Sequence, residues 1–313
     1  VVRLEYRNFL ERYTCYELIP ESSKMIVFDS QLLVRKAFFA LLKNEIRSAP
    51  VWDHKVQSFV GMVTVTDYIN ILRKYHDEPE ELGRQLDTNK IQDWRENLGL
   101  SPRMINIGPK DDLYVAVSTL LSNKIHRLPV LDRQTGNPLF IITHKRVLSF
   151  IHQHFAASGL AALDFTLEEL NLGSIRRCGE VHTATMETKL LDILNTFVEK
   201  GVSAVPIVNS EDVVTGVYAK FDVITLARER TYNDLNVPLS KALETSAHTQ
   251  KSEKDGVHTC SLKDSFRSVI DKIVRARVHR LIVTDDDKRP VGIVSLSDIL
   301  AYLLGTEVSK NVT

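Results

Sequence analysis

The sequence predicts an α/β fold built from four copies of one small unit, and an internal repeat is the main observation. Three segments share a glycine, a short apolar strand and an aspartate that opens an apolar helix: GMVTVTDYI at 61–69, GVYAKFDVI at 216–224 and GIVSLSDIL at 292–300. Asp222 and Asp298 lie 76 residues apart, while Asp67 and Asp222 lie 155 apart, about twice that spacing. A further copy is therefore expected near residue 145, and FIITHKRVL stands there, at 140–148.

A second strand and a helix complete each unit. An apolar strand precedes every copy, and these strands are SAPVWD (48–53), HRLPVLD (126–132), SAVPIVN (203–209) and HRLIVTD (279–285). Upstream lies a helical pattern, clearest at Phe266, Val269, Ile270, Ile273 and Val274, which follow the spacing of one helix face. Each unit should thus run strand, helix, strand, turn, strand, helix. Units of roughly sixty residues are marginal alone, so we expect them to pack in pairs.

The repeat divides the chain into an N-terminal segment and four units. The segment covers 1–23, and the units cover 24–85, 102–156, 172–232 and 245–306. Polar stretches at about 76–100, 156–172 and 231–256 are predicted to join the units. Met25–Phe28 (MIVF) is predicted to be an apolar strand outside the regular alternation. It either pairs within its own unit or offers a free edge to another chain.

Composition argues against several functional classes. The 313 residues are 43% apolar, and 40 Lys and Arg balance 40 Asp and Glu, so no overall charge favours nucleic acid or an anionic membrane. The apolar runs are too short to span a bilayer, and no signal-peptide pattern follows Val1. Cys15, Cys178 and Cys260 are odd in number and lack CxxC spacing. They argue against a disulfide framework or structural zinc and favour a reducing compartment.

The repeated aspartates have two candidate roles. Asp67, Asp222 and Asp298 each occupy the first turn of a predicted helix, where a carboxylate caps the helix and complements its dipole. A carboxylate is also a suitable acceptor for the two hydroxyls of a vicinal diol. The second unit differs, because Arg146 replaces the aspartate and Phe140 replaces the glycine. A guanidinium can only donate, so it cannot serve a diol in the same way.

Basic residues form a second recurring pattern. Two His-Arg pairs stand at the same place in the second and fourth units, and an arginine takes that place in the first. One such histidine alone is more often a hydrogen-bonded core residue, but the repetition indicates an anion site. Phosphate oxygens require several charge-assisted donors, which arginine supplies in a planar fork. With a lysine from the second unit, the set is Arg47, His126, Arg127, Lys145, His279 and Arg280.

These patterns resemble a known family over nearly the whole chain. The units are similar to cystathionine-beta-synthase (CBS) domains, and four in tandem resemble the gamma regulatory subunits of AMP-activated protein kinase. The resemblance rests on KAFFALL (36–42), NKIHRLPVLD (123–132), THKR (143–146), YAKFDVITLA (218–227), TYNDLNV (231–237), VHRL (278–281) and GIVSLSDIL. It implies four tandem CBS repeats, paired into two pseudo-dimeric modules that form a flat disk. Adenosine phosphates would bind in clefts between paired units.

The resemblance also implies roles for residues of this sequence. Asp67, Asp222 and Asp298 would hold ribose hydroxyls, and the six basic residues would hold phosphates in a shared central channel. The adenosine pockets would be lined by Met62, Thr64, Thr66, Ile105, Ser174, Gly179, Val202, Ser203, Ala219, Lys220, Ser295 and Ser297. The unit that carries Arg146 is expected to bind no nucleotide, which leaves at most three sites.

The implied function is regulatory and not catalytic. Such a subunit would bind AMP, ADP and ATP competitively and transmit its occupancy to a kinase alpha subunit, with a beta subunit as scaffold, in a cytoplasmic or also nuclear heterotrimer. An enzyme is disfavoured because the sequence has neither a metal-binding carboxylate group with a base nor a GxxxxGK[ST] loop. No cofactor or metal is expected. The alternative is a CBS regulatory module of another system that binds a different adenosine ligand, such as S-adenosylmethionine.

Overall fold

Four antiparallel hairpins form the framework of the fold. The computed structural model describes residues 2–21, 25–97, 99, 104–155, 163–173, 181–224, 234–246 and 257–305. The hairpins are β2 (Ser48–Asp53) with β3 (Ser58–Thr64), β4 (Arg127–Leu131) with β5 (Pro138–Thr143), β6 (Ala204–Val208) with β7 (Val214–Ala219), and β9 (Arg280–Thr284) with β10 (Pro290–Ser295). Each has a register shift at the same point, next to the pairs Val51–Gly61, Val130–Phe140, Ile207–Gly216 and Val283–Gly292. The shared irregularity identifies the four hairpins as copies of one structure.

A short parallel pairing, either a strand or a single bridge, completes each unit. β1 (Phe28–Asp29) pairs with β2, and β8 (Thr259–Cys260) pairs with β9. In the second and third units a single bridge takes this place. The paired residues are Phe28 and Val51, Ile107 and Val130, Ala184 and Ile207, and Cys260 and Val283, and the partners lie 23 residues apart in every unit. The prediction for Met25–Phe28 was therefore wrong in one respect, because Phe28 begins the regular first strand of its own unit and not a strand outside the alternation.

Helices follow the order that the sequence predicts. The first helix of each unit is α2 (Val34–Lys43), α6 (Leu113–Ser122), α9 (Leu190–Glu199) or α12 (Phe266–Ala276). After the hairpin come α3 (Val65–Lys74), α7 (His144–Phe155) and α13 (Leu296–Leu304), while the third unit has the short 3-10 helix η3 (Asp222–Ile224). The periodic apolar residues Phe266, Val269, Ile270 and Ile273 of α12 are buried. Burial of this face explains why the 3.6-residue pattern identified the helix.

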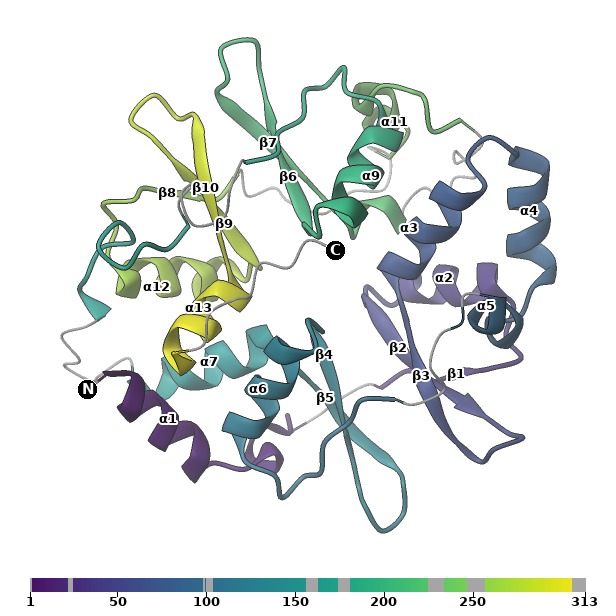
Figure 1. Ribbon diagram of the computed structural model, residues 1–313, viewed down its shortest axis with the longest axis horizontal. Helices are drawn as coiled ribbons and strands as arrows, with labels where there is room; N and C mark the ends of the chain where they lie inside the picture. Colours follow the sequence, from purple (N-terminus) through teal and green to yellow (C-terminus); the bar gives the residue numbers. More distant parts are fainter. Residues whose placement is uncertain are drawn as a thin grey trace.

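Two hydrophobic cores join units that are not consecutive in the chain. One core combines the first and third units and includes Phe38 and Phe197; the other combines the second and fourth and includes Leu120 and Phe266. Viewed down the shortest axis of the molecule, the units form a ring in the order first, second, fourth, third (Figure 1). Helices pack between neighbouring units of the ring, since α3 contacts α9 and α7 contacts α12 and α13. Each small unit thus buries the apolar face that it would otherwise expose.

Further helices cover the rim of this framework. α1 (Val2–Arg12) inserts Tyr6 and Leu10 into the core of the second and fourth units, and η1 (Cys15–Leu18) follows it. α4 (Pro79–Thr88) and α5 (Ile91–Asn97) pack on α2, so the expected joining stretch at 76–100 contributes two helices to the first unit's surroundings. α11 (Leu239–Ser246) adds Leu239 to the other core.

Candidate functional site

Two of the repeated aspartates use one carboxylate oxygen to cap a helix. Thr64 N and Thr64 Oγ1 donate to Asp67 Oδ2 at 2.6 and 2.8 Å, and Ser295 N and Ser295 Oγ donate to Asp298 Oδ2 at 2.9 and 2.6 Å. The aspartate amides return bonds to the two hydroxyls, which completes a capping box at α3 and at α13. Within the described chain these bonds converge on Oδ2. Oδ1 therefore keeps its capacity to accept, and capping is compatible with binding a diol.

The third aspartate has a reduced version of the same arrangement. Ala219 N donates to Asp222 Oδ2 at 2.7 Å, but alanine has no hydroxyl for the reciprocal bond.

The pKa of Asp67 reflects its burial. Burial raises this pKa to about 6, and the hydrogen bonds from Thr64 and the positive charge of Arg95 oppose the rise. Asp67 therefore remains mostly ionised at neutral pH, as a diol acceptor should be.

In the second unit a guanidinium takes the aspartate's place. The Arg146 amide donates to Thr143 Oγ1 at 3.2 Å, so α7 is capped without a carboxylate. Arg146 Nε donates to the carbonyl oxygen of Leu18 at 3.0 Å, which ties the side chain to the N-terminal segment. This corner of the unit presents donors where the other units present an acceptor.

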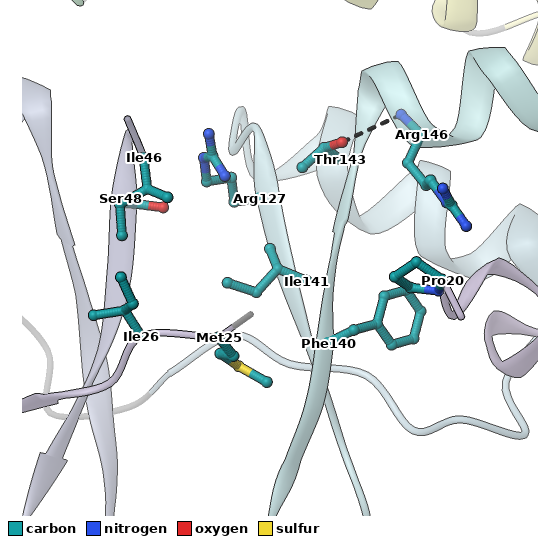
Figure 2. A pocket seen from close by; sticks show the side chains of 10 residues that line it. All are labelled: Pro20, Met25, Ile26, Ile46, Ser48, Arg127, Phe140, Ile141, Thr143 and Arg146. Carbon is teal, nitrogen blue, oxygen red and sulfur yellow. Dashed lines mark hydrogen bonds between the residues drawn. The ribbon is translucent and has the colours of Figure 1, made fainter. Parts of the chain in front are cut away.

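A cavity of about 230 Å³ opens beside Arg146 (Figure 2). Side chains of the N-terminal segment, the first unit, the β4–β5 hairpin and the start of α7 surround it: Pro20, Met25, Ile26, Ile46, Ser48, Arg127, Phe140, Ile141, Thr143 and Arg146. Met25 and Ile26 therefore line a cavity between the first two units instead of forming an edge strand. Phe140, at the position of the glycine in the other units, fills part of the same space with its ring.

The six basic residues assigned to phosphate are brought together from three units. The positive charges of Arg47, Arg127 and Arg280 act on both His126 and His279, and Lys145 also acts on His279. Lys220 of the third unit acts on His126 and lies within the field of Arg280. We call the combined set the basic cluster, and it consists of Arg47, His126, Arg127, Lys145, Lys220, His279 and Arg280. All four units contribute to it.

Burial and mutual repulsion disfavour the positively charged forms of residues in the basic cluster. Burial, and then the charge of Arg47, lowers the pKa of Arg127 to about 10, and burial followed by the surrounding cations lowers the pKa of His279 to about 3. The pKa values of Lys145 and Lys220 are lowered by burial and by neighbouring arginines. In the part of the chain that is described, every charge acting on these four groups is positive. An anion in their midst would relieve the repulsion.

His126 meets solvent although protein atoms surround it. The residue is exposed to solvent, yet the many protein atoms around its ring and the charges of the nearby cations lower its pKa. A group with both properties lies in a recess that water can enter. The Arg47 guanidinium is 5.2 Å from the centroid of the Phe221 ring, which links the first unit to the third beside this recess.

Several of the predicted adenosine-pocket residues lie near the aspartates in the chain. Met62, Thr64 and Thr66 lie at the end of β3 and the start of α3, and Ser295 and Ser297 occupy the same positions around Asp298. Near Asp222, Lys220 N donates to Ser203 O at 3.1 Å, which places Lys220 opposite Ser203, while Ala219 pairs with Ala204. Val202 precedes Ser203 in the chain. Ile105 is 41% exposed and lies two residues before the bridge at Ile107. Ser174 and Gly179 lie outside the described residues.

Sequence reasoning missed three contributors to the site. Lys220 joins the basic cluster, although we expected it to line an adenosine pocket. Arg95 of α5 donates to the carbonyl oxygens of Met62 and Val60 at 3.1 and 2.9 Å, and its charge partly offsets the rise in the pKa of Asp67 that burial causes. His144 is buried against His126. Each occurs in one unit only, so a repeat comparison gives no signal for it.

The comparisons with known proteins agree with this architecture. A CBS domain is matched at residues 173–229 and 254–305. These two segments of the chain are similar to the CBS domain. The chain is 42% identical over 305 residues to 5'-AMP-activated protein kinase subunit gamma-3 of Homo sapiens, and 41% identical over 304 residues to that of Bos taurus. Each alignment covers 96% of this chain and 60% of the relative, so the chain spans about 60% of the length of these curated relatives.

The structural similarity to a solved protein extends over nearly the whole chain. The crystal structure of protein MJ1225 from Methanocaldococcus jannaschii superposes with a TM-score of 0.66 and covers 93% of this chain and 99% of that protein. Its 18% identity establishes a shared fold. Among the described residues of the CBS repeats, no three His, Cys, Asp or Glu side chains form a metal-binding group. No described helix is long and apolar enough to cross a membrane.

Proposed function

We propose that this CBS-domain chain is a non-catalytic regulatory subunit that senses adenine nucleotides. AMP, ADP and ATP would compete for at most three sites, with their ribose hydroxyls on Asp67, Asp222 and Asp298 and their phosphates on the basic cluster. The observation that carries the proposal is the convergence of cations from all four units, whose charges lower one another's pKa values. Phosphate is the group of a nucleotide that such a cluster attracts.

The proposal extends to assembly with kinase subunits. The relatives are named as gamma subunits of 5'-AMP-activated protein kinase. By this homology the chain would join a catalytic alpha subunit and a beta scaffold subunit, and nucleotide occupancy would regulate the kinase. Co-expression with an alpha and a beta subunit should yield a stable complex. Failure of the three chains to co-purify would contradict this part of the proposal.

The chemistry of the cluster also separates adenine nucleotides from S-adenosylmethionine, the alternative ligand. S-adenosylmethionine carries a positive sulfonium and no phosphate, so the basic cluster would repel it where it attracts AMP. Isothermal titration calorimetry of the purified chain should therefore show strong binding of AMP and much weaker binding of adenosine and S-adenosylmethionine. Tighter binding of S-adenosylmethionine than of AMP would overturn the proposal.

A variant tests the ribose assignment in the same titration. Asp298→Asn preserves the shape of the side chain and an oxygen for capping, but it removes the charge that favours two ribose hydroxyls. The number of AMP molecules bound per chain should fall by one, with little change in thermal unfolding of the nucleotide-free protein. An unchanged stoichiometry would show that Asp298 only caps α13.

A further inference from the structure

A pair of histidines joins the basic cluster to the interior of the second unit. His144, the first residue of α7, is 4% exposed, and its Nδ1 lies 3.4 Å from Nδ1 of His126. The two rings meet edge to face with their centroids 5.3 Å apart. In the described chain, His144 Nε2 is buried and has no hydrogen-bond partner. Among the described residues, this ring therefore makes its polar contact with His126, a member of the basic cluster.

The hairpin places the two rings opposite each other. Arg127 pairs with Thr143 in the β4–β5 ladder, so the residues just outside the ladder, His126 and His144, are cross-strand neighbours. The same position opposite Arg47 is Val65, opposite Ser203 it is Lys220, and opposite His279 it is Leu296. Among the four units, only the second thus backs its cluster residue with an imidazole. His279, backed by leucine, is an internal comparison.

Contact with phosphate requires one particular proton on His126. Phosphate oxygens accept hydrogen bonds, so the nitrogen that reaches them must carry hydrogen. His126 Nδ1 is directed at His144, which leaves Nε2 for the recess. A neutral His126 donates through Nε2 only if Nδ1 accepts, and then His144 Nδ1 must be the donor in the 3.4 Å contact.

The alternative is a doubly protonated His126, and its surroundings disfavour that form. Arg47, Arg127, Lys220 and Arg280 all act on His126, and a further positive charge would add to their repulsion. A neutral ring with hydrogen on Nε2 contributes a donor without contributing charge. The unpartnered His144 Nε2 is then a lone pair, and a buried acceptor without a partner is tolerated more often than a buried N–H.

We infer that His144 is a positioning residue, which holds His126 in the neutral Nε2–H tautomer so that His126 can donate to a nucleotide phosphate. The inference rests on the proposed function, since it refines how one residue of the basic cluster meets its ligand. On this inference, the two histidines of the basic cluster would differ in how they meet phosphate. His126 would bind phosphate as a neutral donor, whereas no tautomer is imposed on His279 by Leu296.

Two substitutions separate positioning from packing. His144→Leu reproduces the arrangement of the fourth unit and removes the donor, whereas His144→Asn keeps an N–H close to the position of Nδ1. We expect His144→Leu to weaken AMP binding about threefold to tenfold at pH 7.5, the effect of one hydrogen bond. His144→Asn should stay within about twofold of the wild type. Adenosine binding should be the same in all three proteins, which controls for general damage to the fold.

The decisive measurement is nitrogen-15 NMR of the histidine rings in the AMP-bound wild type at pH 7.5. His126 should appear as the Nε2–H tautomer and His144 as the Nδ1–H tautomer, and calorimetry in buffers of different ionisation enthalpy should show greater proton uptake for His144→Leu than for the wild type. A His126 ring that is doubly protonated, or protonated only on Nδ1, would overturn the inference while AMP binding itself persisted. A wild type that binds no AMP would instead overturn the proposed function.

Discussion

Removal of Arg127 should stabilise the nucleotide-free protein and weaken nucleotide binding at the same time. Arg127 is half-buried, and its pKa is lowered from 12.5 to about 10, first by burial and then by the positive charge of Arg47. Arg127→Met retains the apolar stem of the side chain and deletes its charge. A residue held in place only by favourable contacts would destabilise the fold when removed. A member of a repelling cluster should do the opposite.

The magnitude follows from the lowered pKa. The lowered pKa corresponds to an upper limit of roughly 3 kcal/mol of unfavourable free energy in the folded state. Partial exposure and solvent screening reduce this value, so we expect a gain of about 1 to 2 kcal/mol in the free energy of unfolding. Loss of a charge-assisted phosphate contact should weaken AMP binding by about 1.5 to 3 kcal/mol, on the order of ten- to a hundredfold.

The assay combines thermal unfolding without nucleotide and calorimetry with AMP. Arg133→Met in the same unit is the matched control, because Arg133 is 74% exposed and donates to Asp111 at 2.6 Å. Loss of that surface ion pair should cost about 0 to 1 kcal/mol and leave AMP binding unchanged. If Arg127→Met lowered the unfolding midpoint, Arg127 would be a structural residue. If it left AMP affinity unaltered, its assignment to phosphate would be wrong.

Two further predictions concern Arg146, which replaces the aspartate in the second unit, and the buried histidines. Arg146→Asp should rebuild with Thr143 the capping box seen at Asp67 and gain about 0.5 to 2 kcal/mol in the free energy of unfolding. Calorimetry should then show one more AMP molecule bound per chain. If only the stability rose, the ring of Phe140 and not the missing carboxylate would prevent binding in this unit. For the histidines, burial lowers the pKa of His144 and of His279 from 6.5 to about 3, so the unfolded chain binds protons first as pH falls. Urea unfolding should therefore show a loss of up to about 1.4 kcal/mol per pH unit per histidine below pH 6.5, and His144→Leu should reduce that slope; an equal slope in the variant would mean that His144 titrates normally.

The repeat made the fold predictable because its signals are local. The expected strand at 48–53 coincides with β2, and the apolar periodicity from Phe266 coincides with α12. Glycine and proline punctuate the units, and the hairpin connects neighbours in sequence. The pairing of the first unit with the third could not be read in the same way, because it depends on which apolar helix faces meet in space. Each unit alone would expose a similar apolar helix face, so the order of the units in the chain does not determine which two units pack together.

The candidate site was predictable to the extent that its residues recur. Asp67, Asp222 and Asp298 were found because three copies share one position, and the capping geometry at Asp67 and Asp298 shows why that position tolerates a carboxylate. His144 and Lys220 occupy equivalent places in their hairpins, where the other units carry valine and leucine. A comparison of repeats treats such differences as variation. Only the assembled ring places Lys220 beside Arg280.

The basic cluster would link phosphate charge to the arrangement of all four units. The first unit supplies Arg47 and the third supplies Lys220, so neither could surround a phosphate group by itself. The chain as a whole is neutral, and the positive potential of the basic cluster arises because the ring brings these side chains together. Because like charges already repel in the folded state, an anion gains from every cation that it screens, and a more highly charged phosphate chain gains more. Discrimination among nucleotides would therefore reside in the cations shared between units, while the aspartates, each within one unit, would treat AMP, ADP and ATP alike.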